Sequence, residues 1–98
     1  MKLTRRKKDA NHDAVADAWR RFGWIVVDTS AVGSNAVPGF PDLVCIRWPL
    51  VLLVEVKDGS KAKLTCWEKT FAALVGSPPY LVCHSVEDAI EQAQAWRK

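Results

Sequence analysis

Two β-prone segments follow one another in residues 42–57, DLVCIRWPLVLLVEVK. Residues 43–47 and 50–57 are rich in apolar and β-branched side chains, and only Trp48 and Pro49 separate them. Because proline fixes φ and lacks a backbone donor, this dipeptide predicts the turn of a tight hairpin. Both segments carry apolar side chains at odd and even positions, which is typical of a sheet covered on both faces. We therefore expect helices on each side of the sheet.

The flanking sequence predicts three helices and two further short strands. Residues 24–28 and 80–83 have strand character, whereas residues 29–41 are rich in Ser, Gly, Asn and Pro and predict a loop. Thr65 and Glu68 form a capping-box pattern at the start of a helix that Gly76 ends. The expected order is αβββαβα, an α/β fold with a mixed four-stranded sheet flanked by helices.

Apolar residues at three- and four-residue steps mark the expected buried face of each helix. These faces comprise Ala10, Ala14, Val15, Ala18, Trp19 and Phe22 in the first helix; Trp67, Phe71, Leu74 and Val75 in the second; and Val86, Ala89, Ile90, Ala93 and Trp96 in the third, which Ser85 caps.

The positive charge of the chain is concentrated at its start. The 98 residues include 14 Lys and Arg against 11 Asp and Glu, and Lys2, Arg5, Arg6, Lys7 and Lys8 precede the first acid. We therefore expect a basic arm at residues 1–8 followed by one domain at residues 9–98. Such an arm favours attraction to a polyanion such as nucleic acid, although a solvated terminus explains it equally well.

Hydropathy and cysteine content limit the cellular setting. No apolar run approaches the roughly 18 residues of a membrane helix, and no apolar stretch follows the charged start as in a secretory signal. We expect a cytoplasmic protein without membrane contact. Cys45, Cys66 and Cys83 are odd in number and widely spaced, which predicts reduced core thiols. A zinc site built from the histidines and these cysteines is a poor fit, because no CxxC or HxxxH pair exists.

The hairpin brings two carboxylates together. Asp42 and Glu55 each lie six residues from the Trp48-Pro49 turn, so a two-residue loop places them directly opposite one another. Their Cβ atoms would be about 5 Å apart, with Lys57 diagonally across at roughly 7 to 8 Å. Two close carboxylates repel unless a cation lies between them. Oxygen ligands suit Mg²⁺ or Mn²⁺, which commonly bridge carboxylates to phosphate, so the pattern predicts phosphodiester hydrolysis.

Three short motifs resemble the VRR-NUC family of the PD-(D/E)XK nuclease superfamily. They are Gly39-Phe40-Pro41-Asp42, Glu55-Val56-Lys57, and Leu64-Thr65 with Glu68, and the resemblance covers nearly the whole chain. Arg5-Arg6 followed by Asp9-Ala10-Asn11 is similar to the opening of small phage-type members.

The resemblance implies a restriction-endonuclease-like αβββαβ(α) core and a metal-dependent DNA endonuclease. Asp42, Glu55 and the Val56 carbonyl would hold Mg²⁺ or Mn²⁺, and Lys57 would assist the attacking water. It further implies products with 5′-phosphate and 3′-hydroxyl ends, selectivity for branched DNA such as Holliday junctions or flaps, a homodimer, and a phage or bacterial context.

Several assignments stay open. The family pattern usually adds an acidic residue from the first helix; Asn11 is the favoured substitute here, with His12 and Asp13 as rivals, although Asn11 could simply cap the helix. Glu68 could belong to the outer shell of the site or serve only the capping box.

The role of the remaining basic residues is also undecided. Lys61 and Lys63 could contact DNA phosphates, as could the arm residues Arg5, Arg6, Lys7 and Lys8, or all could be solvated charges. The alternative functions are a non-catalytic nucleic-acid-binding module on a nuclease-like scaffold and a protein-interaction domain.

Overall fold

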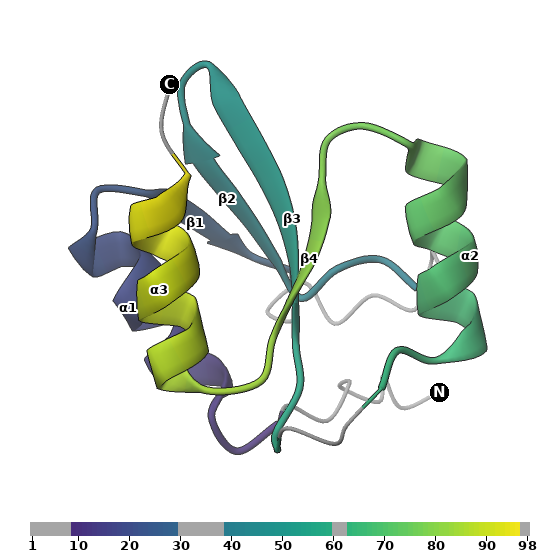
Figure 1. Cartoon of the computed structure of the whole chain (residues 1–98), viewed down its shortest axis with the longest axis horizontal. Coiled ribbons are helices and arrows are strands. Elements are labelled where there is room, and N and C mark those ends of the chain that lie inside the picture. Colours follow the sequence, from purple (N-terminus) through teal and green to yellow (C-terminus); the bar gives the residue numbers. More distant parts are fainter. Residues whose placement is uncertain (1–8, 30–38, 60–62, 97–98) are drawn as a thin grey trace, which may run out of the picture.

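The computed structural model describes residues 9–29, 39–59 and 63–96 (Figure 1). Its elements confirm the expected order αβββαβα. In chain order they are α1 (His12–Arg21), β1 (Ile25–Asp28), β2 (Leu43–Arg47), β3 (Leu50–Val56), α2 (Cys66–Val75), β4 (Tyr80–Cys83) and α3 (Val86–Ala95). β1 therefore begins one residue later than expected, and β3 ends one residue before Lys57.

The four strands form one mixed sheet in the order β1-β2-β3-β4. β1, β2 and β3 are antiparallel neighbours, and β3 pairs with β4 in parallel. The β2–β3 register pairs Leu43 with Val54 and Arg47 with Leu50, which confirms the two-residue turn at Trp48 and Pro49. Trp48 at this turn is 77% exposed.

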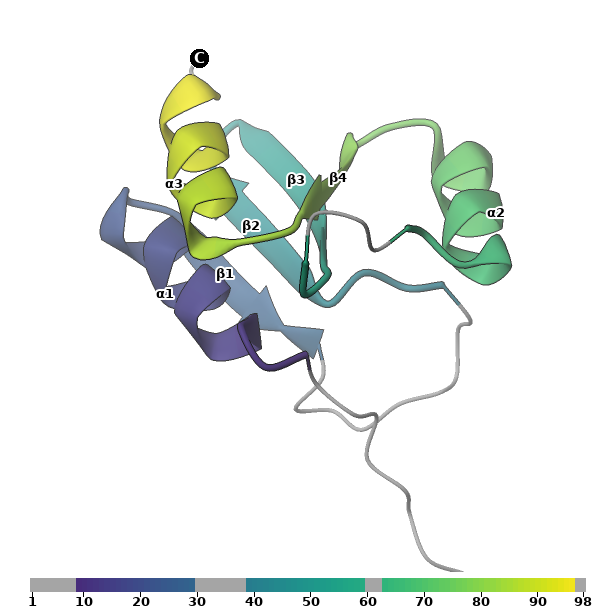
Figure 2. The same cartoon turned by 60° about the horizontal axis from the view of Figure 1, so that its bottom comes forward.

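Helices α1 and α3 cover one face of the sheet (Figures 1 and 2). The fully buried Trp19 of α1 meets Trp24 edge-on, with ring centroids 5.2 Å apart. The Trp24 indole N–H donates to the Ala93 carbonyl of α3 at 3.1 Å, so the start of β1 is tied to both helices. Leu43, Cys45, Leu52, Val54 and Val56 complete this core from the sheet.

The buried face of α1 differs from the expected one. Ala10 precedes the helix and is exposed, and Ala14 is exposed as well. Val15, Ala18 and Trp19 are buried as expected, and His12 joins them, because these positions recur at the three- and four-residue steps that point toward the sheet. The apolar pattern therefore identified the helix and most of its buried face, and it was wrong only at Ala10 and Ala14.

The opposite face of the sheet is only partly covered, so helices do not pack fully on both sides. In both views α2 lies beyond β4, on the side away from α1 and α3 (Figures 1 and 2). Ile25 and Val27 alternate with the inward-facing Val26 and are 67% and 47% exposed. Apolar residues at successive positions therefore did not guarantee two covered faces.

The expected buried face of α2 is wrong. Trp67 and Leu74 are 63% and 82% exposed, and Cys66 is exposed rather than a core thiol. Phe71 is half-buried, where its ring lies 5.4 Å from that of Phe40 and 6.1 Å from that of Tyr80. Helix α2 lies beside the sheet rather than over its face, and it packs on the loop before β2 and on the start of β4. Its apolar residues therefore do not meet the main core.

The expected helix ends are confirmed. Thr65 and Glu68 form the reciprocal capping box of α2, Gly76 ends that helix at φ 68°, and the Ser85 side chain caps α3 by accepting from the Asp88 N–H. No helix within the described ranges is both long and apolar enough to cross a membrane.

Candidate functional site

Glu55 is the centre of a buried polar cluster at the end of β3. Its side chain is 2% exposed and points to the face opposite Val54, because successive residues of a strand alternate. Glu55 Oε1 lies 3.4 Å from the Tyr80 hydroxyl, and Oε2 lies 3.6 Å from the Lys57 ammonium. The carboxylate is therefore held between a phenol and a cation.

Lys57 follows β3 directly and is fixed by both its backbone and its side chain. Its N–H donates to the Cys83 carbonyl at 2.9 Å, which continues the parallel pairing with β4. Its ammonium lies 2.8 Å from Glu68 Oε1. Burial disfavours the charged ammonium, but the hydrogen bond to Glu68 and the negative charges nearby outweigh it and raise the pKa of Lys57. Lys57 is therefore a cationic hydrogen-bond donor at neutral pH and not a proton acceptor.

Asp42 approaches the same end of β3 from the loop before β2. It is 7% exposed, and its Oδ2 accepts a hydrogen bond of 2.9 Å from the Val56 N–H. In a strand the N–H and carbonyl of one residue point to the same side, so the Val56 carbonyl is directed toward Asp42 as well. These are the residues that the sequence singled out for metal binding.

Tyr80 is a site residue that the sequence analysis missed. Its hydroxyl donates to the Gly39 carbonyl at 3.0 Å and also lies near Glu55. Burial and then the charges of Glu55, Glu68 and Asp42 raise the pKa of Tyr80. All three carboxylates therefore act electrostatically on one hydroxyl. The parallel register pairs Tyr80 with Leu53, on the face of Glu55, and no local sequence signal reveals that register.

Glu68 combines the two roles that the sequence left open. Its Oε1 accepts from the Thr65 N–H at 2.7 Å, as a capping box requires, and the same oxygen pairs with Lys57. The side chain is 5% exposed and is the buried residue of α2. The first turn of α2 therefore places the Glu68 carboxylate in the site.

Asn11 does not cap α1 with its side chain, so that interpretation is wrong. It occupies the N-cap position, but its Nδ2 lies 3.3 Å from the carbonyl oxygens of both Lys57 and His84. Its Oδ1 is buried and lacks a hydrogen-bond partner among the described residues. Asn11 thus links the start of α1 to the residues that follow β3 and β4.

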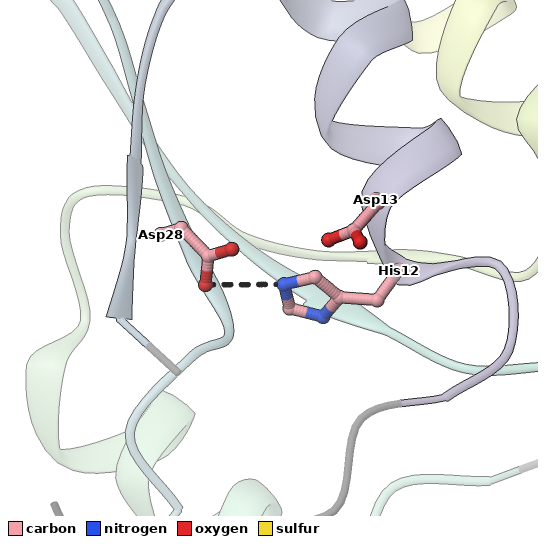
Figure 3. A group of neighbouring side chains, drawn as sticks. All are labelled: His12, Asp13 and Asp28. Atoms are coloured by element: carbon pink, nitrogen blue, oxygen red, sulfur yellow. Dashed lines mark ion pairs between the residues drawn. The ribbon is translucent and has the colours of Figure 1, made fainter. Parts of the chain in front are cut away.

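His12 and Asp13 lie apart from the Glu55 cluster. His12 is 2% exposed, and its Nε2 is 3.1 Å from Asp28 Oδ1 at the end of β1 (Figure 3). Asp13 is exposed on the same turn of α1. The rival residues for the first-helix position therefore gather around β1 instead.

Most of the expected nucleic-acid-binding residues fall outside the described part of the chain. Lys63 is described and exposed, whereas Arg5, Arg6, Lys7, Lys8 and Lys61 lie outside the described residues.

The thiols of the two buried cysteines, Cys45 and Cys83, are unreactive near neutral pH. Burial, with the neighbouring Cys83, raises the pKa of Cys45 to about 12, and burial raises the pKa of Cys83 to about 12. Because the thiolate is the reactive form, neither thiol is a nucleophile near neutral pH. This agrees with their expected role as reduced core thiols.

The donor set fits a hard divalent cation. Asp42, Glu55 and Glu68 are each less than a tenth exposed, while Lys57 is the cation that pairs with two of them. Burying carboxylates is costly unless positive charge lies close to them. Carboxylate and carbonyl oxygens are the ligands that Mg²⁺ and Mn²⁺ prefer.

Glu68 makes the stability of the fold sensitive to acid. Burial would raise its pKa, but hydrogen bonding with the Glu55 side chain, with Lys57 and with the Thr65 N–H lowers it from 4.5 to about 2. Because the folded pKa is depressed, the ionised carboxylate stabilises the fold above pH 4.5 and this contribution, on the order of 3 kcal/mol, disappears as the pH falls toward 2.

We therefore expect Glu68→Gln to unfold at a lower temperature than the native chain at pH 6, with the difference shrinking toward pH 2. Thermal unfolding followed by circular dichroism across this range in the presence of a chelator measures it. Glu91→Gln, on the exposed side of α3, serves as the control and should parallel the native chain. A Glu68→Gln curve that also runs parallel would contradict the assignment.

Comparison with solved structures identifies a VRR-NUC domain as similar to this chain. The superposition has a TM-score of 0.65 and covers 87% of this chain and 91% of the other. The two sequences are 19% identical. No protein-family model and no curated protein matches the sequence. At this identity the likeness establishes the fold, which is the one that the sequence motifs implied. The chain therefore has the fold of a VRR-NUC domain.

Proposed function

We propose that the chain is a metal-dependent endonuclease that hydrolyses phosphodiester bonds in DNA. The observation that carries the proposal is the gathering of Asp42, Glu55 and Lys57 at the end of β3, in a domain with the VRR-NUC fold. A buried pair of acids next to a lysine at a strand end has no packing purpose, since apolar residues would fill the same space at lower cost.

Asp42, Glu55 and the Val56 carbonyl would hold Mg²⁺ or Mn²⁺. Bound there, the cation would polarise the phosphoryl group and lower the pKa of an attacking water. Neighbouring groups keep these ligands in place: the Val56 N–H orients Asp42, and the Lys57 ammonium lies 3.6 Å from Glu55 Oε2. Such fixed neighbours matter because ligand orientation strongly affects metal affinity and activity.

Lys57 would act through its charge. Its raised pKa keeps the ammonium protonated, so it can donate to a phosphate oxygen or to the attacking water and offset charge that develops during hydrolysis. Glu68 pairs with the same ammonium and holds it beside Glu55. Glu68 is therefore proposed as a positioning residue of the outer shell, together with Asn11, which binds the Lys57 carbonyl.

The finer assignments follow from the resemblance. We propose branched DNA, such as Holliday junctions or flaps, as the substrate, with the basic residues of 1–8 and Lys61 and Lys63 contacting phosphates. We also propose a homodimer, which would place two sites on two strands. The exposed Trp67 and Leu74 lie seven positions apart on one side of α2 and offer apolar surface for a second copy.

The test is a cleavage panel over junction, flap, duplex and single-stranded DNA with Mg²⁺, with Mn²⁺ and with a chelator. We expect the junction or flap to be cut with either metal, giving 5′-phosphate ends, and cutting to stop when the metal is removed and to resume when it is returned. Cleavage that persists in the chelator would contradict the proposal.

The same panel separates the alternative functions. Binding that weakens with salt, but no cleavage with either metal, would support a non-catalytic nucleic-acid-binding module. The absence of both would point to a protein-interaction domain.

A further inference from the structure

A second group of metal-ligating side chains lies between the start of α1 and the end of β1. His12, Asp13 and Asp28 each offer one ligand atom, and these atoms lie within 4.8 Å of one another. Figure 3 shows the imidazole of His12 extending from α1 toward the Asp28 carboxylate, with Asp13 on the adjacent position of the helix. Three ligands from two elements can therefore reach one point.

This group is distinct from the Asp42–Glu55 cluster. Asp28 pairs with Leu43, and Leu43 pairs with Val54, so these three side chains share the face that α1 covers. Glu55 follows Val54 and faces the other way. The two groups of ligands therefore lie on opposite faces of the sheet.

The burial and the missing hydrogen bond of the His12 side chain point to a bound ligand. The residue is 98% buried, since its exposed fraction is 2%, and its Nε2 makes no hydrogen bond although Asp28 Oδ1 lies only 3.1 Å away. A buried ring nitrogen close to a carboxylate oxygen, but not aligned with it as a donor, is poorly explained by packing because burying an unsatisfied polar atom is costly. The same arrangement is natural for two ligands that share a cation.

We propose that His12, Asp13 and Asp28 bind a divalent transition-metal ion such as Zn²⁺. One imidazole nitrogen with two carboxylate oxygens favours Zn²⁺, Co²⁺ or Mn²⁺ over Mg²⁺, which prefers oxygen ligands alone. The partly exposed Asp28 and exposed Asp13 leave the site accessible for loading. The bound ion would fasten the start of α1 to β1, and this inference stands independently of nuclease activity.

Titration of the full chain with Co²⁺ in excess Mg²⁺ tests the site. Mg²⁺ occupies sites made of oxygen ligands, and the visible absorption of Co²⁺ reports an imidazole-containing site directly. We expect saturable binding by the native chain and a rise in the melting temperature of several degrees with Zn²⁺, because a ligand that binds the folded state stabilises it.

Variants show which of the two groups of ligands, on opposite faces of the sheet, binds Co²⁺. Co²⁺ binding should weaken at least tenfold in each of three variants, His12→Gln, Asp28→Asn and Asp13→Asn. Because Asp13 is exposed, its variant keeps the test valid even if replacement of the buried His12 unfolds the chain. Asp17→Asn, an exposed change on the same helix, should bind Co²⁺ normally. The inference is overturned if Co²⁺ does not bind, if Asp42→Asn abolishes binding, or if Asp13→Asn and Asp28→Asn leave the affinity unchanged.

Discussion

Asp42→Asn is expected to lower the rate of DNA cleavage by about 10³-fold, because loss of one carboxylate ligand removes several kcal/mol of metal-dependent transition-state stabilisation. The fold should survive the change. Asn retains a side-chain oxygen that can accept the 2.9 Å hydrogen bond from the Val56 N–H, and it has nearly the same volume. DNA binding should persist, since removing a negative charge does not weaken attraction to phosphate.

Single-turnover cleavage at saturating Mg²⁺, together with a binding titration, measures both quantities. Asp58→Asn makes the same change of charge at an exposed position just beyond Lys57 and should cleave normally. Cleavage by Asp42→Asn within a few-fold of the native rate would remove Asp42 from the proposed site. Equal loss in both variants would attribute the effect to net charge rather than to a ligand.

Gly39→Ala is expected to destabilise the fold by about 2 to 5 kcal/mol, adding the cost of a positive φ to that of overpacking. Gly39 has φ 83°, and an added Cβ would lie 2.6 Å from the Trp67 carbonyl carbon and closer still to its oxygen. Both atoms are backbone of α2, so a rotamer change cannot relieve the clash. The loop that carries Asp42 and the carbonyl that binds Tyr80 would have to move.

Gly23→Ala isolates the cost of the backbone conformation. Gly23 has φ 89°, but an added Cβ there meets no atom within 4 Å. We expect Gly23→Ala to lose about 1 kcal/mol, the cost of a positive φ alone, and Gly39→Ala to unfold at a clearly lower temperature. Similar melting temperatures for the two variants would mean that the loop does not pack on α2 as described.

The hairpin and the centre of the site could be predicted from local sequence. The Trp48-Pro49 turn fixes the β2–β3 register, and strand periodicity then determines which side chains share a face with Glu55. The motif around Asp42 and the spacing of Glu55 and Lys57 add the expected chemistry. The capping box of α2, the Ser85 cap of α3 and Gly76 likewise depend on neighbouring residues, and they were predicted correctly.

The predicted buried faces of the helices were wrong where an apolar residue has more than one possible packing partner. Hydrophobic periodicity identified α2 as amphipathic, but it does not say what the helix packs against, and Trp67 and Leu74 face outward. The same limit applies to Ala14 on α1, which is exposed although its spacing fits the stripe. A pattern reports which residues could be buried, whereas burial depends on which elements meet.

By itself the sequence determined the element order, the hairpin register and the approach of Asp42 to the end of β3, because each depends on residues close together along the chain. The tertiary structure alone decided that Tyr80 reaches Glu55, that Asn11 binds the carbonyls of Lys57 and His84, and that His12 meets Asp28. Those contacts join residues far apart in the sequence, and their geometry follows from the packing of whole helices and strands rather than from any local preference.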